Sequence, residues 1–264
     1  MPRAVTGSVQ TRTEGPIGWV LFDHPERRNA LDAAMWRAIP EAIERHDADP
    51  SVRVIGLRGQ GDDAFVSGAD ISEFRESRSG PEAKLYDRIT ARAFASIEAT
   101  NKPVVAVIHG FCIGGGAGIA VCADLRYAAD DAVFAVPPAR LGLGYSSAGI
   151  AKLVEVVGAA NARDLLFTAR RVTAASAARI GLVHRVVPKI ELDAFAHDAM
   201  TRIAKNAPLT IAAAKVNLRE LSRPAGERDR DAMQASIDRC FESDDYAEGV
   251  AAFLDKRSPK FQGR

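Results

Sequence analysis

The 264-residue sequence predicts an α/β fold that ends in a helical region. Short apolar stretches alternate with segments of helical hydrophobic spacing up to Pro188, and from Leu192 onward every segment is of the helical type. Hydrophobic residues make up 47% of the chain, which is enough to bury a full core. We place a boundary near residue 205, so that residues 1–205 form the α/β core and residues 206–264 form the helical region.

The first half of the chain supplies strands and helices in alternation. An apolar run predicts a strand over 17–23, and apolar residues at every third or fourth position predict a helix over 31–47. Residues 52–59 form a second apolar run that ends at a glycine. Residues 65–74 fit a short strand, a turn and the start of a helix, and a polar loop over 76–83 leads into a further helix.

The second half repeats the alternation. The strand predicted over 102–110 has a proline at its first edge, and two short strands follow at 125–130 and 132–137. A helix is predicted from residue 147 to about residue 158. Residues 173–188 contain a helix, a glycine that ends it, and a strand.

Charge and cysteine content argue against several classes of protein. The 35 Lys and Arg residues nearly balance 34 Asp and Glu residues, so we expect no binding to nucleic acid or to an anionic membrane. No uncharged apolar run approaches the roughly 18 residues of a membrane helix, and the first residues lack the apolar core of a signal peptide. The three cysteines are too few for a disulfide framework. These features favour a cytoplasmic protein with reduced thiols.

The segment 111–124, FCIGGGAGIAVCAD, places Gly114, Gly115, Gly116 and Gly118 around the start of a helix. Each glycine destabilises a helix interior by about 1 kcal/mol relative to alanine, so some other interaction must offset this. The spacing does not fit a dinucleotide-binding turn, a phosphate loop or a nucleophile elbow. Two interpretations remain, a tightly packed strand-to-helix turn and an oxyanion hole.

An oxyanion hole needs two backbone N–H groups that point at one oxygen. A helix N-terminus offers unpaired N–H groups, and glycine lets a substrate carbonyl approach them. The turn SGADI at 67–71 supplies a second candidate donor at Ala69. Each such donor is typically worth about 3–4 kcal/mol in the transition state.

The segments FVSGADISEF, KPVVAVIHGFCIGGGAGIAVCADLRYAAD, AVFAVPPARLGLG and AARIGLVHRVVP occur in this order and spacing. With them the chain resembles the crotonase (enoyl-CoA hydratase/isomerase) superfamily over nearly its whole length. The resemblance implies a spiral of β-β-α units, then helices that drive formation of a homotrimer or a dimer of trimers. It also implies acyl-CoA thioester substrates, with coenzyme A as part of the substrate and no metal or other cofactor. By position, Ala69 and Gly115 carry the two oxyanion-hole N–H groups.

The sequence departs from the hydratases of this family at both catalytic glutamates. Gly118 and Pro138 stand at those positions, and neither side chain can move a proton. Tyr145 stands where the similar methylmalonyl-CoA decarboxylase branch has a tyrosine. It is either a hydrogen-bond donor to the substrate or an aromatic residue that only lines the pocket. The reactions left open are an enolate reaction of the hydratase/isomerase type, decarboxylation of a malonyl-type CoA with help from Tyr145, and acyl-CoA binding without catalysis.

Further residues are candidates for substrate binding or acid–base work. Glu73 and Glu76 fit a solvated helix start better, although a carboxylate from 73–82 would restore proton transfer. Asp70 fits a helix cap or an ion-pair partner, and His109 fits a structural role. By the resemblance, Arg28 and Lys260 border the CoA phosphates and Phe261 borders the adenine. The residues that we expect to contact substrate are Arg28, Gly68, Asp70, Ile71, Gly114, Gly118, Pro138, Leu141, Lys260 and Phe261.

Overall fold

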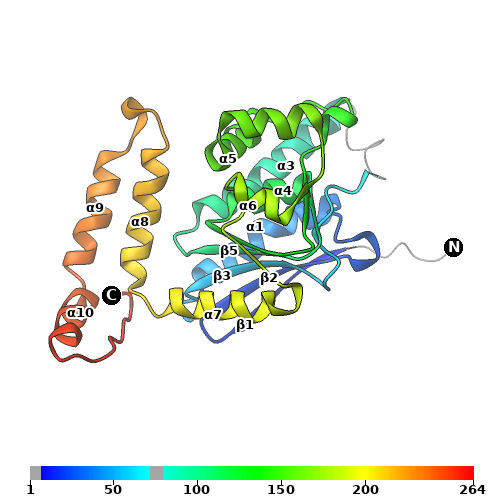
Figure 1. The fold of residues 1–264 in the computed structure, drawn as a ribbon. Coiled ribbons are helices and arrows are strands. Elements are labelled where there is room, and N and C mark those ends of the chain that lie inside the picture. Colours follow the sequence, from blue (N-terminus) through cyan, green and yellow to red (C-terminus); the bar gives the residue numbers. More distant parts are fainter. Residues whose placement is uncertain (1–6, 72–79) are drawn as a thin grey trace.

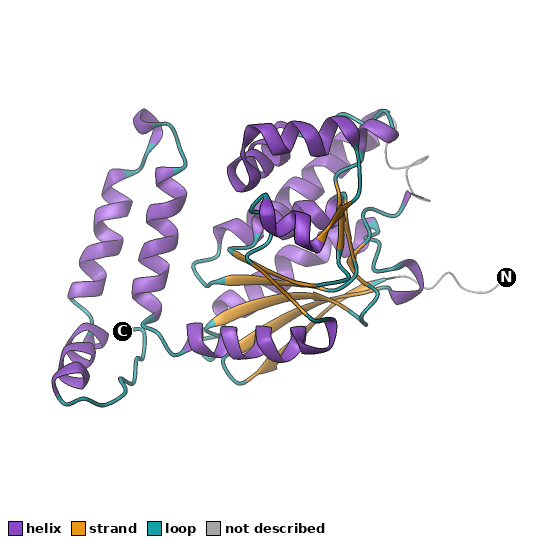
Figure 2. Ribbon diagram, viewed as in Figure 1, coloured by secondary structure: helices purple, strands orange, loops and turns teal. Residues whose placement is uncertain are grey.

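The computed structural model describes residues 7–71 and 80–264, and the strands in these ranges form two sheets (Figure 1, Figure 2). The larger sheet has six strands in the order β1-β2-β3-β5-β7-β10, and the smaller has the order β4-β6-β8-β9. The strands are β1 (Ser8–Glu14), β2 (Ile17–Asp23), β3 (Val54–Gly59), β4 (Ala64–Val66), β5 (Val104–Ile108), β6 (Phe111–Ile113), β7 (Leu125–Ala129), β8 (Val133–Ala135), β9 (Val172–Thr173) and β10 (Arg185–Val187).

From β3 to β8, consecutive strands alternate between the two sheets, and this builds a spiral. The pairs β3–β4, β5–β6 and β7–β8 each place one strand in the large sheet and the next in the small sheet, and a helix follows each pair. Pairing is parallel except for β1 with β2 and β8 with β9. The α/β fold with repeated β-β-α units is therefore confirmed.

Helices cover both faces of the large sheet. The α-helices of the core are α1 (Ala33–Ala48), α3 (Gly80–Ala99), α4 (Gly115–Cys122), α5 (Ser147–Thr168), α6 (Ala174–Arg179) and α7 (Leu192–Ala204). Short 3-10 helices are η1 (Pro25–Arg27), η3 (Pro138–Arg140), η4 (Lys189–Glu191) and, in the C-terminal region, η5 (Ala225–Glu227). Alternate residues of β5 face opposite sides: Val104 and Ala106 pack into the main core, whereas Val105 and Val107 pack against α7.

Three strands and one helical stretch differ from the sequence-based expectation. The strand β1 was not predicted, because its residues are mostly polar and partly exposed; Gly15 (φ 55°) turns the chain so that β1 pairs antiparallel with β2. The short strands β6 and β9 were not predicted either. Gly158 adopts non-helical angles of φ 74° and ψ 158°, so the helix predicted from residue 147 ends near it as expected, and a second, unpredicted helical stretch of α5 continues across the kink to Thr168. Glu73, Glu76 and most of the predicted loop lie outside the described residues.

The C-terminal region consists of α8 (Pro208–Leu221), α9 (Arg230–Phe241) and α10 (Asp244–Leu254), and α8 and α9 stand beside the α/β body in Figure 1. Lys215 ties α8 to the core, since its Nζ donates to the Lys102 carbonyl at 2.8 Å and to Asp124 Oδ2 at 2.7 Å. Asp245 accepts hydrogen bonds from the backbone of Gln262 and Gly263, which holds the chain end against α10. Among the described helices, none combines the length and the apolar character that a bilayer crossing requires.

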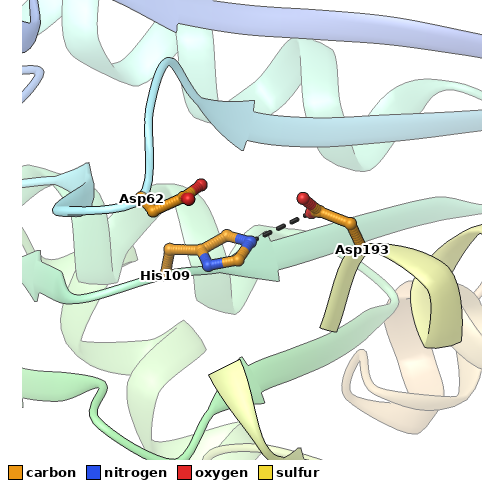
Figure 3. A group of neighbouring side chains, drawn as sticks. All are labelled: Asp62, His109 and Asp193. Atoms are coloured by element: carbon orange, nitrogen blue, oxygen red, sulfur yellow. Dashed lines mark hydrogen bonds and ion pairs between the residues drawn. The ribbon is translucent and has the colours of Figure 1, made fainter. Parts of the chain in front are cut away.

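A polar cluster fastens α7 to the sheet. His109 follows β5, and its Nε2 lies 3.0 Å from Asp193 Oδ1 in the first turn of α7 (Figure 3). Arg58 Nη2 donates to Asp193 Oδ2 at 2.7 Å and to Asp62 Oδ1 at 2.9 Å. The His109 hydrogen bond and the Arg58 charge lower the pKa of the Asp193 carboxyl. His109 thus has the structural role that we expected.

Asp193→Asn is expected to destabilise the protein at pH 7 and to lose this effect in acid. A lowered pKa in the folded state contributes stability above the unfolded value of about 3.9, and this contribution disappears as the pH falls through the folded value. Because the Asp193 side chain is half-exposed, we expect about 1 kcal/mol or less in urea titrations at pH 7. Asp198→Asn, on the same helix and more exposed, serves as the control. A difference that stays constant from pH 7 to pH 3 would contradict this assignment.

Candidate functional site

The glycine turn joins β6 to α4. Gly114 adopts φ 54° and ψ −110°, and its N–H donates to the Ala135 carbonyl at 2.8 Å. The Gly118 N–H donates to the Gly114 carbonyl at 3.0 Å and closes the first helical turn. The Gly115 N–H has no acceptor in the described part of the chain, as is usual for the first residue of a helix.

Close packing requires two of these glycines. A Cβ on Gly116 would lie 2.2 Å from the Val66 carbonyl oxygen, so α4 rests directly on the backbone of β4. A Cβ on Gly115 would lie 2.8 Å from Cζ2 of Trp36, a buried residue of α1. The interpretation as a tightly packed turn is therefore confirmed. It is compatible with an oxyanion hole, because the packing involves the Cβ positions and the Gly115 N–H has no acceptor in the described part of the chain.

The second turn faces the first. The Leu31 N–H donates to the Gly68 carbonyl and the Asp70 N–H donates to the Leu31 carbonyl, both at 2.8 Å. These two bonds fix the turn on either side of Ala69, whose own N–H has no acceptor in the described residues. The Ala69 nitrogen lies 3.7 Å from the position that a Cβ would take on Gly115. Two unpaired backbone donors from separate turns thus meet at one place.

Ala69 and Gly115 both line a cavity of about 180 Å³ between α1, α3, the two turns and the segment before α5. Most of the residues expected at the site line it, and among the described lining residues none is Lys, Arg or His. The expected residues on its wall are Gly68, Ala69, Ile71, Gly114, Gly115, Pro138, Leu141 and Tyr145.

One wall was not predicted from the sequence. Tyr86, Asp87, Thr90 and Phe94 lie on one face of α3 and all line the cavity. Counted from Tyr86, the other three follow at one, four and eight residues, which is a helical spacing. The spacing does not indicate which element this face of α3 packs against. Trp36 also lines the cavity, and its buried indole N–H has no acceptor in the part of the chain that the structure describes.

Gly118 does not line the cavity, and two aromatic side chains occupy the space in front of it. A Cβ on Gly118 would lie 2.7 Å from Phe94 Cζ and 3.5 Å from the Tyr145 hydroxyl oxygen. A glutamate at this position would therefore collide with Phe94. Burial raises the pKa of Tyr145 to about 12, with a smaller contribution from the nearby Cys122 and Cys112. The Tyr145 phenol is consequently neutral, and able to donate a hydrogen bond, at physiological pH.

Four expected residues lie away from the cavity in this chain. The Arg28 guanidinium stacks 4.7 Å from the Phe111 ring centroid and lines a separate hollow. Asp70 forms an ion pair with Arg27 at 2.8 Å, which agrees with the expected ion-pair role. Lys260 is exposed, and Phe261 packs near Gly249 in the C-terminal region.

The cluster of Asp62, His109 and Asp193 brings three potential metal ligands within 4.8 Å of one another. No sequence pattern indicates this cluster, because the three residues come from separate segments of the chain. Arg58 already bridges the two carboxylates, so the positive charge that a metal would supply is present. We assign the cluster to holding α7.

A family model described as enoyl-CoA hydratase/isomerase matches residues 12–264. The chain belongs to this family. The crotonase resemblance inferred from the sequence motifs is thereby confirmed.

Characterised relatives match along nearly the whole chain. It is 34% identical to a crotonyl-CoA hydratase of Syntrophomonas wolfei over 248 residues, which cover 94% of this chain and 95% of that protein. It is also 34% identical to a carnitinyl-CoA dehydratase of Proteus mirabilis, with 97% of this chain and 99% of that protein covered. A crystal structure of an enoyl-CoA hydratase/carnithine racemase from Magnetospirillum magneticum matches with a TM-score of 0.93 and 37% identity, over 99% of this chain and 98% of that one.

Gly116→Ala tests the packing of the turn. The new methyl group would meet a backbone carbonyl that cannot turn aside, so we expect a loss of about 2–3 kcal/mol in the free energy of unfolding. Gly226→Ala is the matched control, because a Cβ there meets nothing within 4 Å, and its effect should stay within about 0.5 kcal/mol. Equal urea midpoints for the two variants would show that α4 does not rest on β4 as closely as described.

Proposed function

We propose that this protein is an acyl-CoA enzyme that stabilises a thioester enolate between the backbone N–H groups of Ala69 and Gly115. The observation that carries the proposal is the pair of unpaired donors on one cavity wall. A thioester α-carbon becomes reactive only when negative charge on the carbonyl oxygen is stabilised. Two fixed donors do this in the transition state without reorganisation, which is how an enzyme lowers the barrier selectively.

Tyr145 is the proposed proton or hydrogen-bond donor to the enolate carbon. Its hydroxyl lies 3.5 Å from the Cβ position of Gly118, one helical turn beyond the Gly115 donor. Its raised pKa keeps it protonated, which suits a donor and not a base. The role as a lining aromatic remains the alternative for this residue, and the variant below separates the two.

The relatives named hydratase and dehydratase support chemistry at an α,β-unsaturated thioester. The residues at the two glutamate positions of the family weigh against hydration, because neither Gly118 nor Pro138 supplies a carboxylate. At position 118, the Phe94 ring also occupies the space that a glutamate side chain would need. Without those carboxylates, no group at these two positions activates the water that hydration adds.

Decarboxylation of a malonyl-type thioester is the second candidate, and one observation favours it. A substrate carboxylate would enter a cavity without a Lys, Arg or His among its described lining residues, and the loss of its hydration promotes the release of CO2. The electrons of the broken carbon–carbon bond would pass into the enolate held by Ala69 and Gly115. Tyr145 would then deliver a proton to the α-carbon and regain one from solvent. The third candidate, acyl-CoA binding without turnover, predicts no product from either class of substrate.

We further propose that copies of the chain assemble through the C-terminal region into a homotrimer or a dimer of trimers. Large apolar side chains are exposed there, and a second copy would bury them. The exposed residues include Leu218, Leu221, Phe241, Phe253 and Leu254.

The first test is mass spectrometry of the CoA products after separate incubations with crotonyl-CoA and methylmalonyl-CoA. Loss of CO2 from methylmalonyl-CoA, reduced at least 100-fold by Tyr145→Phe, is the result expected for decarboxylation with Tyr145 as donor. Gain of one water by crotonyl-CoA would establish hydration instead. Binding of both thioesters without any product would leave the acyl-CoA binding alternative.

The alkaline pH dependence should reflect the raised pKa of Tyr145. A donor with a pKa of about 12 stays neutral well above the pH at which an ordinary tyrosine, with a pKa near 10, begins to ionise. The ratio of kcat/KM between wild type and Tyr145→Phe is therefore expected to stay constant from pH 7 to pH 10. A fall of this ratio to about half by pH 10 would show that Tyr145 ionises with an ordinary pKa near 10. A ratio near one at every pH would show that Tyr145 has no part in proton donation.

A further inference from the structure

Helix α4 is held at both ends, and its far end is tied to the C-terminal region. Gly115 begins the helix and carries one of the proposed donors, and Cys122 is its eighth and last residue. A helix of this length is about 12 Å long. Close packing on the Val66 carbonyl fixes the helix near its start, at Gly116. One contact near the start leaves the direction of the helix to be set by contacts elsewhere.

Asp124 lies directly beyond the end of α4 and joins it to two other elements. Its Oδ2 accepts a hydrogen bond at 2.7 Å from the Val104 N–H, at the start of β5. The same oxygen accepts one from Lys215 Nζ of α8, also at 2.7 Å. Lys215 Nζ donates as well to the Lys102 carbonyl, at 2.8 Å. The end of α4, the start of β5 and α8 are therefore joined through one ammonium group and one carboxylate.

The Lys215 ammonium is largely withdrawn from solvent at this junction. Its side chain is 12% exposed, against 35% for that of Asp124. Burial lowers the pKa of Lys215, and the charge of Asp124 opposes this effect. A charged group that has left water needs acceptors in place of that water. An apolar side chain at position 215 would leave the Asp124 carboxylate and the Lys102 carbonyl without this donor.

The direction of α4 matters because it is also the direction of the Gly115 N–H. Peptide N–H groups in an α-helix point along the axis toward its start, which is why a first turn can bind an anion. A tilt of α4 about the Gly116 contact would therefore turn the Gly115 N–H away from an oxygen that it shares with Ala69. A misplacement of about 1 Å in a site of this kind can lower a reaction rate by about 100-fold.

We propose that Lys215 is a positioning residue for the oxyanion hole, on which it acts through Asp124 and α4. The C-terminal region then has a task besides assembly, because it helps to set the direction of the helix that carries one donor. The inference rests on the acyl-CoA function proposed above. A contact of the same region with α5, between Ser222 Oγ and Glu155 Oε1 at 3.3 Å, does not involve Asp124 and provides the comparison.

Binding of two thioesters tests this role. Butyryl-CoA has an uncharged acyl group, whereas acetoacetyl-CoA, a 1,3-dicarbonyl compound, ionises to an enolate whose charge extends to the thioester oxygen. An intact pair of donors lowers the pKa of bound acetoacetyl-CoA, which the ultraviolet absorbance of the enolate reports in a pH titration. In Lys215→Met, we expect the acid dissociation constant of the bound compound to fall by about tenfold or more. The affinity for butyryl-CoA should change less than about threefold, because no charge develops on its oxygen.

Three further variants keep the test independent of folding. Asp124→Asn acts by the same route with a smaller change and should lower the dissociation constant in the same direction. Lys215→Arg keeps a charged donor and should restore a value nearer to wild type. Ser222→Ala removes the contact with α5 and should keep the wild-type value. Urea midpoints and light scattering show whether each variant is folded and assembled as the wild type is.

The outcomes separate the proposals. An unchanged dissociation constant in folded Lys215→Met or, where that variant does not fold, in Asp124→Asn overturns the role of Lys215 and leaves the acyl-CoA function intact. An equal loss of affinity for both thioesters also overturns it, because it shows general damage to the site. Failure of both thioesters to bind to wild type overturns the acyl-CoA function itself. Binding to wild type without any lowering of the acetoacetyl-CoA pKa overturns the oxyanion hole.

Discussion

The close approach of α4 to the backbone of β4 is the constraint on which the site depends. Gly116 lets the helix lie on the Val66 carbonyl, and this contact sets where the first turn of α4 begins. The neighbouring Gly115 packs on Trp36 with its Cβ side, and the Ala69 nitrogen lies 3.7 Å from that same Cβ position. Core packing therefore helps to set the spacing of the two donors.

The fold could be predicted from the sequence wherever the hydrophobic pattern was strong. The apolar runs of β2, β3 and β5 and the periodic face of α1 gave the α/β alternation directly. The polar strand β1 could not be recognised, because it is an edge strand whose register comes from its partner β2. In α5, the glycine at 158 interrupts the helix as its sequence predicts, and the helical stretch beyond it, which buries Ala162 and Leu165, was not predicted.

The site was predictable in part. The turns at Ala69 and Gly115 have local sequence signatures, and each signature reflects a backbone conformation that needs glycine nearby. The α3 wall and the cluster around His109 have none, because their members meet only through the tertiary structure. Gly118 illustrates the difference. The resemblance places a glutamate of the family's hydratases at this position, and only the structure shows that Phe94 lies 2.7 Å from the Gly118 Cβ position.

The chemical centre proposed here consists of peptide groups, and this affects how it tolerates mutation. Ala69 donates through an atom that every residue except proline possesses, so exchanges of its side chain leave the donor in place. An alanine scan across the cavity would test Trp36, Phe94 and Tyr145 but would leave position 69, already an alanine, unchanged. The side chains around the two donors can therefore differ between related proteins while the donors stay in place. A change of reaction would require substitutions only among those side chains. In the proposed site, Gly118 and Pro138 stand where the resemblance places the two family glutamates, beside the proposed donors of Ala69 and Gly115.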